Sequence, residues 1–229
     1  MTAIKICGIQ RAEGALAAAE AGADFLGLVF VPQRRRRLTE GQAAQIVKAL
    51  TEYPGDSATK TPQVVGLFAD QPIDEVNRLI KSCHLERVQL CGSESLDYCR
   101  QVQAPVIKVI HVPEGGAQDG DFDRLAESIQ KYQEAGHLVT LDRQVDGLQG
   151  GTGKSFDWSI AARLAQAGHE FLLAGGLTPE NVAVAVRTVA PWGVDVSSGV
   201  ETGGEKDSNK IRAFIQQVRQ VRQVQQADS

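Results

Sequence analysis

The sequence predicts an α/β fold, a single (β/α)8 TIM barrel. Eight short apolar runs alternate strictly with eight longer amphipathic segments along the chain. Runs that are mostly apolar along their whole length are typical of strands buried on both faces of a parallel sheet. The length of 229 residues also fits one such barrel, which takes about 250 residues. A doubly wound open sheet shows the same alternation and remains the alternative architecture.

The predicted strands are short and rich in valine, isoleucine, leucine and phenylalanine. Their C-terminal ends matter most, because the active sites of (β/α)8 barrels lie at that end. The eight runs are residues 3–7, 25–30, 63–68, 87–90, 105–110, 137–141, 171–174 and 193–196.

Capping residues and the spacing of apolar side chains predict the helices. Gly22 follows an alanine-rich stretch as a C-cap, and Thr39 with Gln42 forms a capping box. Thr178 and Pro179 suit the N-cap and first position of a later helix. The helices are expected at 11–22, 40–50, 72–82, 94–102, 121–134, 157–167, 179–189 and 208–226.

One domain is expected over residues 1–229. The polar stretches 54–62 and 115–121 are predicted to be loops of the barrel, since the alternation of runs continues on both sides of each. The last residues, 223–229, are predicted to be frayed, as chain ends commonly are.

Composition and charge argue against several classes of protein. The net charge of -4 and the pI of about 5.6 are unlike those of a general nucleic-acid binder. No apolar run approaches the roughly 18 residues that cross a bilayer, and residues 1–10 lack the pattern of a signal peptide. The chain carries four cysteines, which fit a reducing compartment. We therefore expect a cytoplasmic protein without nucleic-acid or membrane partners.

Two side chains at predicted strand ends are candidates for proton transfer. Cys7 ends the first strand, where a thiolate is a good base if its pKa is lowered, although a free cysteine is also common packing material. Asp142 ends the sixth strand after an apolar run, where burying a carboxylate requires a partner or a task. The alternative for Asp142 is a loop or N-cap aspartate. If both act chemically, the converging strand ends of a barrel bring them to one site.

Two further features indicate anion binding at the same end. Arg34–Arg37 follow the second strand, and one inward arginine of the run would clamp a carboxylate through two hydrogen bonds. Gly175–Gly176 and Ser197–Gly199 follow the last two strands. Barrels commonly bind phosphate with these two loops, and glycines allow close approach of backbone N–H groups.

Neither a metal nor a nucleotide cofactor is expected. Cys83, Cys91 and Cys99 lack metal-ligand spacing, and the four histidines are scattered. The stretch GGTGKS resembles a P-loop, but the first glycine of that motif would fall on Leu148.

Several motifs, in order over nearly the whole chain, are similar to those of one enzyme family. They are KICGI (5–9), GADFLGLVF (22–30) with the arginines after it, VQLCG (88–92), the LD…GGTGKSFDW stretch (141–158), LAGGLTPENV (173–182) and GVDVSSGVE (193–201). The chain thereby resembles phosphoribosylanthranilate isomerases of tryptophan biosynthesis. The resemblance implies a (β/α)8 barrel that converts N-(5-phosphoribosyl)anthranilate to 1-(2-carboxyphenylamino)-1-deoxyribulose 5-phosphate by an Amadori rearrangement.

The resemblance also implies roles for individual residues. Cys7 would be the general base and Asp142 the general acid, acting at opposite ends of a small substrate. Arg36 would pair with the anthranilate carboxylate. The phosphate would be held by backbone N–H groups of Gly176, Ser198 and Gly199, and Asp195 would orient the sugar hydroxyls.

The glycine-rich stretch is expected to act as a lid in such an enzyme. Gly150, Gly151 and Gly153 would let the loop fold over the substrate and exclude water from the imine. The resemblance implies no cofactor, and the sequence leaves open whether the protein is a monomer or a homodimer.

The chain departs from the usual family pattern at two places. Cys91 stands where the family usually has a histidine, and the run Arg34–Arg37 replaces a Ser-Pro-Arg pattern. Since the proposed acid and base are both present, a packing role for position 91 is the favoured interpretation.

Two other functions remain as alternatives. One is a different phosphosugar isomerase or epimerase, although a metal-dependent epimerase would want histidines at strand ends, and a histidine-pathway isomerase would show an internal half-barrel repeat. The other is a binding module for phosphate ligands, which the fold alone does not exclude.

Overall fold

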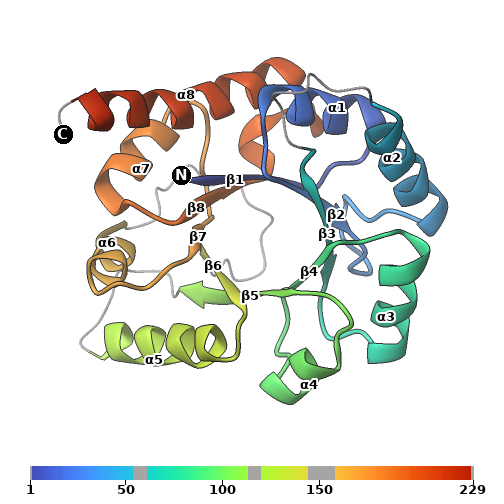
Figure 1. The fold of residues 1–229 in the computed structure, drawn as a ribbon, viewed down its shortest axis with the longest axis horizontal. Helices are drawn as coiled ribbons and strands as arrows, with labels where there is room; N and C mark the ends of the chain where they lie inside the picture. The colour runs from blue at the N-terminus through green and yellow to red at the C-terminus, as the bar shows by residue number, and fades with distance from the viewer. Residues whose placement is uncertain (1, 54–60, 113–119, 144–157, 228–229) are drawn as a thin grey trace.

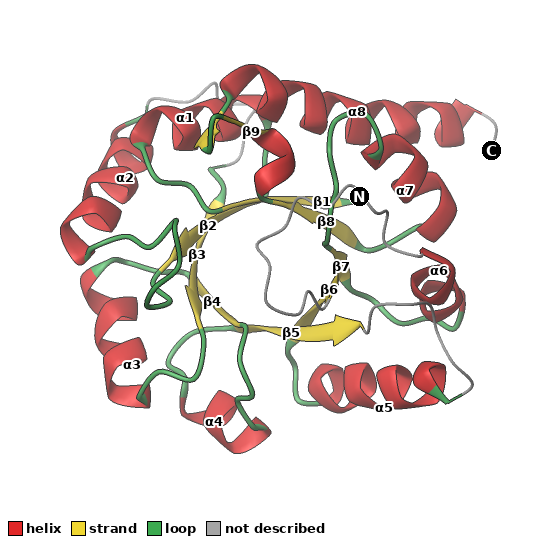
Figure 2. Cartoon of the chain, turned by 180° about the vertical axis from the view of Figure 1, so that it is seen from behind, coloured by secondary structure: helices red, strands yellow, loops and turns green. Residues whose placement is uncertain are grey.

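The computed structural model describes residues 2–53, 61–112, 120–143 and 158–227. Within these ranges eight parallel strands, β1 to β8, close into a barrel in chain order. The helices form a ring around the strands, and α8 lies beside α1 and α7 (Figure 1). Seen from behind, the same ring encloses the strands on all sides (Figure 2). The predicted (β/α)8 barrel is therefore confirmed.

The barrel strands agree closely with the apolar runs of the sequence. They are β1 (Ala3–Cys7), β2 (Phe25–Val29), β3 (Gln63–Phe68), β4 (Arg87–Leu90), β5 (Val106–Val112), β6 (Leu138–Arg143), β7 (Leu172–Leu173) and β8 (Gly193–Val196). After β8 the chain forms the short 3-10 helix η1 (Ser198–Val200) and a small antiparallel pair, β9 (Glu201–Thr202) and β10 (Glu205–Lys206).

The helices begin and end close to the predicted residues. They are α1 (Ala12–Ala21), α2 (Glu40–Glu52), α3 (Ile73–Ser82), α4 (Leu96–Gln101), α5 (Asp121–Glu134), α6 (Trp158–Gln166), α7 (Val182–Val189) and α8 (Ser208–Ala227). Gly22 caps α1 with a left-handed φ of 88°, which favours glycine. The capping box of Thr39 and Gln42 is present at the start of α2.

Several predicted boundaries were wrong by two or three residues, among them the ends of β5 and β6 and the start of α7. β5 and β6 extend beyond the predicted ends, because the ladder between them continues through the pairs His111–Asp142 and Val112–Arg143. α7 begins at Val182, three residues later than predicted. The Thr178 side chain accepts a hydrogen bond from the N–H of Glu180, and the Asn181 side chain accepts one from the N–H of Thr178. These bonds hold a separate turn before the helix.

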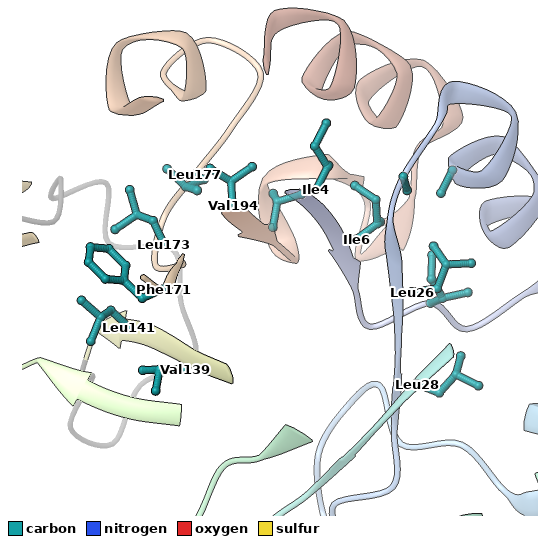
Figure 3. Packing of buried hydrophobic residues seen from close by; sticks show 14 of the residues in the cluster. Ile4, Ile6, Leu26, Leu28, Val139, Leu141, Phe171, Leu173, Leu177 and Val194 are labelled. Carbon is teal, nitrogen blue, oxygen red and sulfur yellow. The ribbon is translucent and has the colours of Figure 1, made fainter. Parts of the chain in front are cut away.

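The core has two layers, separated by the barrel wall. Alternate strand residues such as Ile4, Ile6, Leu26 and Leu28 belong to the large cluster that packs under the helices (Figure 3). The residues between them face the barrel interior and form a smaller cluster, which contains Ala3, Cys7, Phe25, Val29, Val65, Leu67, Ile107 and Leu172. This alternation decides which side chains reach the mouth of the barrel.

The remaining predictions about chain organisation concern loops and the C-terminus. The predicted loops 54–62 and 115–121 lie largely outside the described residues, and α8 extends to Ala227, so fraying of 223–229 stays a prediction. In the part of the chain that the structure describes, each helix is too short or too polar to cross a membrane.

Candidate active site

The predicted acid and base share one mouth of the barrel. Because all strands are parallel, their carboxyl ends meet at the same side. Cys7 is the last residue of β1 and belongs to the interior cluster. Asp142 lies in β6, and its neighbour Leu141 packs outward under the helices. Strand alternation therefore directs Asp142 to the interior, on the same side of the barrel wall as Cys7.

The Cys7 thiol is almost enclosed. Its sulfur is packed so closely against Gly27 that a Cβ atom added to this glycine would lie only 3.0 Å from the sulfur. Burial raises the pKa of the Cys7 thiol, while the ammonium groups of Lys5 and Lys206 lower it through their charge, and the net result is a pKa above the usual value of 9.0. In the absence of substrate, the Cys7 thiol is therefore mainly protonated at neutral pH.

A buried ion pair lies one layer below Cys7. Lys5 Nζ donates to Asp195 Oδ2 at 2.8 Å, and the two side chains are 0% and 6% exposed. Burial alone would lower the pKa of Lys5, but the charge of Asp195 and then that of Cys7 raise it above its usual range. Lys5 is thus an ammonium at any physiological pH.

Arg36 differs from the other arginines of its run. It is half-buried, whereas Arg34, Arg35 and Arg37 are exposed. Its side chain lies over Gly8, where a Cβ would overlap Arg36 Cδ and lie 3.1 Å from Ser197 Oγ. A glycine at position 8, directly after Cys7, therefore leaves the room that the Arg36 side chain occupies.

Glu201 holds the arginines in place. Its carboxylate accepts from Arg36 Nε at 2.5 Å and Nη2 at 2.9 Å, from Arg35 Nη2 at 2.6 Å, and from Lys206 Nζ at 2.9 Å. Burial would raise the pKa of Glu201, but the hydrogen bonds from Arg36, Lys206 and Arg35 bring it to about 2. Three cations surround one carboxylate, so the cluster carries a positive charge that attracts a further anion.

Replacing Glu201 with glutamine should destabilise the protein in a pH-dependent way. The folded pKa of about 2 lies below the ordinary 4.5, so the ionised carboxylate contributes stability that is complete above pH 4.5 and is lost as the pH falls towards 2. We expect Glu201→Gln to lose roughly 3 kcal/mol of unfolding free energy at pH 7. Urea denaturation at several pH values measures this loss, and the gap to the parent should narrow below pH 4.5.

The matched control for that experiment is Glu205→Gln in the same pair of short strands. Glu205 is 52% exposed and pairs with an exposed arginine, so its loss should change stability by less than about 1 kcal/mol. Equal losses in the two variants would contradict the role of Glu201.

The loops after β7 and β8 contact each other closely. Gly176 has a left-handed φ of 74°. Gly199, in η1, packs so tightly that a Cβ there would overlap the carbonyl oxygen of Leu177. Glycine at 199 therefore allows the two loops to touch. Ser198, at the start of η1, is exposed at this junction.

Cys91 follows β4 and His111 lies in β5, across the mouth of the barrel from Cys7. Burial raises the pKa of the Cys91 thiol to about 12, and Gln89 Nε2 donates towards its sulfur at 3.6 Å. His111 Nε2 lies 3.3 Å from the Cys91 carbonyl oxygen, and His111 is the strand partner of Asp142. Cys91 is therefore a packed thiol and a poor base.

Sequence reasoning missed three charged residues of this site. Lys5, Lys206 and Glu201 contact or flank the predicted residues. One signal was present for Lys5, since a lysine inside the apolar run AIKIC has to find a counter-ion. Glu201 ends the motif GVDVSSGVE, but nothing local marked its partner.

Some predicted features lie beyond what the structure describes. Gly150, Gly151 and Gly153 fall outside the described residues, so their role in a lid stays a prediction. Among the described residues no group of three or more histidine, cysteine or acidic side chains is placed to hold a metal ion.

Comparisons with known proteins agree with the fold and with the enzyme family that the sequence resembles. The family model described as N-(5'phosphoribosyl)anthranilate (PRA) isomerase matches residues 4–217. The N-(5'-phosphoribosyl)anthranilate isomerase of Dehalococcoides mccartyi is 42% identical over 219 residues, 96% of each chain. The crystal structure of the Thermotoga maritima phosphoribosyl anthranilate isomerase has a TM-score of 0.80 and 33% identity, covering 96% of this chain and 100% of that one.

A further solved relative contains a ligand. It is a phosphoribosyl anthranilate isomerase in complex with reduced 1-(o-carboxyphenylamino)-1-deoxyribulose 5-phosphate, with a TM-score of 0.76 and 31% identity. The match covers 96% of this chain and 100% of that one.

Proposed function

We propose a mechanism for this chain from the premise that it belongs to the N-(5'-phosphoribosyl)anthranilate isomerase family. It is an isomerase of tryptophan biosynthesis, and its substrate is a phosphosugar joined to anthranilate. The mechanism rests on one observation: Cys7 and Asp142 lie on different strands and face the interior at the same mouth. The geometry thus supports an acid and a base on either side of one substrate.

The reaction divides into two proton transfers. Asp142, as the protonated acid, gives its proton to the furanose ring oxygen, the C1′–O bond breaks, and a Schiff base forms between C1′ and the anthranilate nitrogen. Cys7, as the thiolate, takes the proton from C2′, and the electrons of that bond form a C1′–C2′ double bond. The resulting enolamine tautomerises, so that C2′ becomes the ketone and C1′ gains a proton.

The experiment that tests this function follows the loss of phosphoribosylanthranilate fluorescence. The substrate is generated in place because it is short-lived, and the product is identified by mass. Turnover of this substrate by the purified protein supports the proposal. A protein that binds the product analogue and does not turn the substrate over would instead be the phosphate-ligand binding module.

Arg36 is the proposed partner of the anthranilate carboxylate. Its side chain lies over Gly8, the residue after Cys7, and its guanidinium is oriented by Glu201. Arg36→Ala should raise KM by about 10- to 100-fold, because a charged hydrogen bond contributes roughly 1.5–3 kcal/mol. Steady-state kinetics measure this effect, and kcat should change much less than KM.

Arg34→Ala is the matched control, since Arg34 is an exposed residue of the same run. Its KM should stay within about twofold of the parent, as for most exposed charges. An unchanged KM in Arg36→Ala with a raised KM in Arg35→Ala would move the role to the neighbouring residue.

The phosphate end of the substrate is assigned to the loops after β7 and β8. Backbone N–H groups of Gly176, Ser198 and Gly199 are the proposed donors, and the close contact of the two loops supports this assignment. Asp195 uses Oδ2 for Lys5, and its Oδ1 lacks a hydrogen-bond partner among the residues that the structure describes. That oxygen is the proposed acceptor for a sugar hydroxyl.

We also propose that the protein acts in the cytoplasm, as a monomer or a homodimer. The thiol that serves as the base has to stay reduced, which a reducing compartment ensures. For Thermotoga maritima, monomers generated from the dimeric enzyme have been crystallised. Sedimentation equilibrium distinguishes the two states for this chain.

A further inference from the structure

Lys5 and Cys7 share one face of β1. They are two residues apart, and strand alternation directs both to the interior. The pairing of β1 with β8 closes the barrel, and in this pairing Lys5 lies opposite Asp195. Lys5 lies between Cys7 and the amino-terminal end of β1, and its side chain is fully buried.

Stability alone gives a weak reason for this ion pair. Replacing a buried pair with apolar residues of similar volume is often neutral or stabilising, because two charges lose their hydration. The interior side chains include the apolar Ala3, Phe25 and Leu172. One oxygen of Asp195 is buried without a partner within the described ranges. The pair is therefore a costly feature of the barrel interior.

The charged and titratable groups around Cys7 either favour or oppose a negative charge on its sulfur. Burial and Asp195 oppose the negative charge, whereas Lys5 favours it through both its charge and a hydrogen bond, and Lys206 favours it through its charge. Lys206 is already bound to Glu201 and to the Ser197 carbonyl oxygen. The groups facing Cys7 are Lys5 from β1, Asp195 from β8, Lys206 from β10 and the Cys91 thiol after β4.

We propose that Lys5 is a positioning residue of this reaction, whose ammonium, anchored by Asp195, supports the negative charge that the Cys7 sulfur carries as a base. This proposal rests on the proposed role of Cys7. The sulfur is negative before it takes the proton of C2′ and neutral afterwards, while Lys5 stays positive throughout. Asp195 has a second effect, because its own charge limits how strongly Lys5 acts on the sulfur.

The two members of the pair therefore have opposite expected effects. In the free enzyme, Lys5→Met should move the titration of Cys7 to higher pH, with about tenfold less thiolate at a given pH. Asp195→Asn should move it to lower pH, because Lys5 then has the sulfur as its main anionic partner. The ultraviolet absorbance of the thiolate measures both, after subtraction of the matching variant that also carries Cys7→Ser.

A second variant guards against a failure to fold. Lys5→Met leaves Asp195 buried and unpaired, so the double variant Lys5→Met/Asp195→Leu replaces the pair with apolar side chains. Cys7 in the double variant should still titrate at higher pH than in the parent. A purely structural role would give no shift, or shifts of the same sign in Lys5→Met and Asp195→Asn, and either result would overturn the proposal.

The titration requires no substrate, so its outcome is separable from that of the proposed function. Turnover retained in Cys7→Ala would remove Cys7 as the base, and with it the role of Lys5 in the reaction, even if the titrations shift. Turnover lost in Cys7→Ala with unshifted titrations would leave the base in place and overturn the role of Lys5 alone.

Discussion

Replacing Cys7 with serine should lower kcat by about 10²- to 10⁴-fold, the usual contribution of a general base. Serine is close to cysteine in size, so it should fit the nearly enclosed position of Cys7, and KM should change little. The hydroxyl group, however, does not ionise at any working pH and has no thiolate form to take the C2′ proton. Fluorescence-detected turnover at saturating substrate measures the loss.

The other thiol at the same mouth provides the control. Cys91 has a pKa of about 12 and is packed against Gln89, so Cys91→Ser should keep kcat within about threefold, as an exchange of similar volume does. If Cys91→Ser and Cys7→Ser lost activity equally, the assignment of the base to Cys7 would be wrong.

The same assignment predicts the pH dependence of the parent enzyme. The thiolate is the active form, and burial holds the pKa of Cys7 above 9.0. Between pH 6 and pH 8 the thiolate fraction should therefore rise about tenfold per pH unit, and kcat/KM should rise with it as far as Asp142 keeps the proton that it donates. A profile that is flat over this range would show that another group limits the rate.

Replacing Asp142 with asparagine should lower kcat by a similar factor, about 10²- to 10⁴-fold. The amide has the shape of the protonated carboxyl group but has no acidic proton to give to the ring oxygen. Ring opening then becomes the slow step, and binding of a product analogue should stay within a few-fold of the parent. Turnover kinetics and calorimetry of the analogue measure the two effects.

An aspartate at the opposite mouth serves as the comparison. Asp24 precedes β2, and its Oδ2 accepts a hydrogen bond from the N–H of Ile4 at 2.8 Å. Asp24→Asn should lower the unfolding free energy by about 1 kcal/mol with normal kcat. If Asp142→Asn lost stability and kept kcat, Asp142 would be a structural residue and the acid would have to be sought elsewhere.

Local sequence patterns predicted the barrel because its strands and caps are local features. The apolar runs, Gly22 and the Thr39 capping box each depend on residues within one turn or one strand. The start of α7 was misplaced because the side chains of Asn181 and Thr178 accept hydrogen bonds from the N–H groups of Thr178 and Glu180, which hold a separate turn before the helix. Capping preferences alone do not decide between such neighbours.

The active site was predicted less completely, because its contacts join distant parts of the chain. Cys7 and Asp142 were found by their places at strand ends, and their chemical roles came from the family resemblance. The Lys5–Asp195 pair joins residues 190 positions apart, and Arg36 is 165 positions from Glu201. Only the closed barrel brings such partners into one layer, so no local pattern in the sequence could have indicated them.

These long separations have a consequence for protein synthesis. Cys7 and Arg36 leave the ribosome well before Asp195, Glu201 and Lys206. A nascent chain that ends before β8 contains Cys7 and Arg36. It lacks the later groups that influence the charge of the sulfur and orient the guanidinium. Enzymatic activity should therefore arise only after residue 206 has been translated, and a chain released before β8 would be inert towards the substrate.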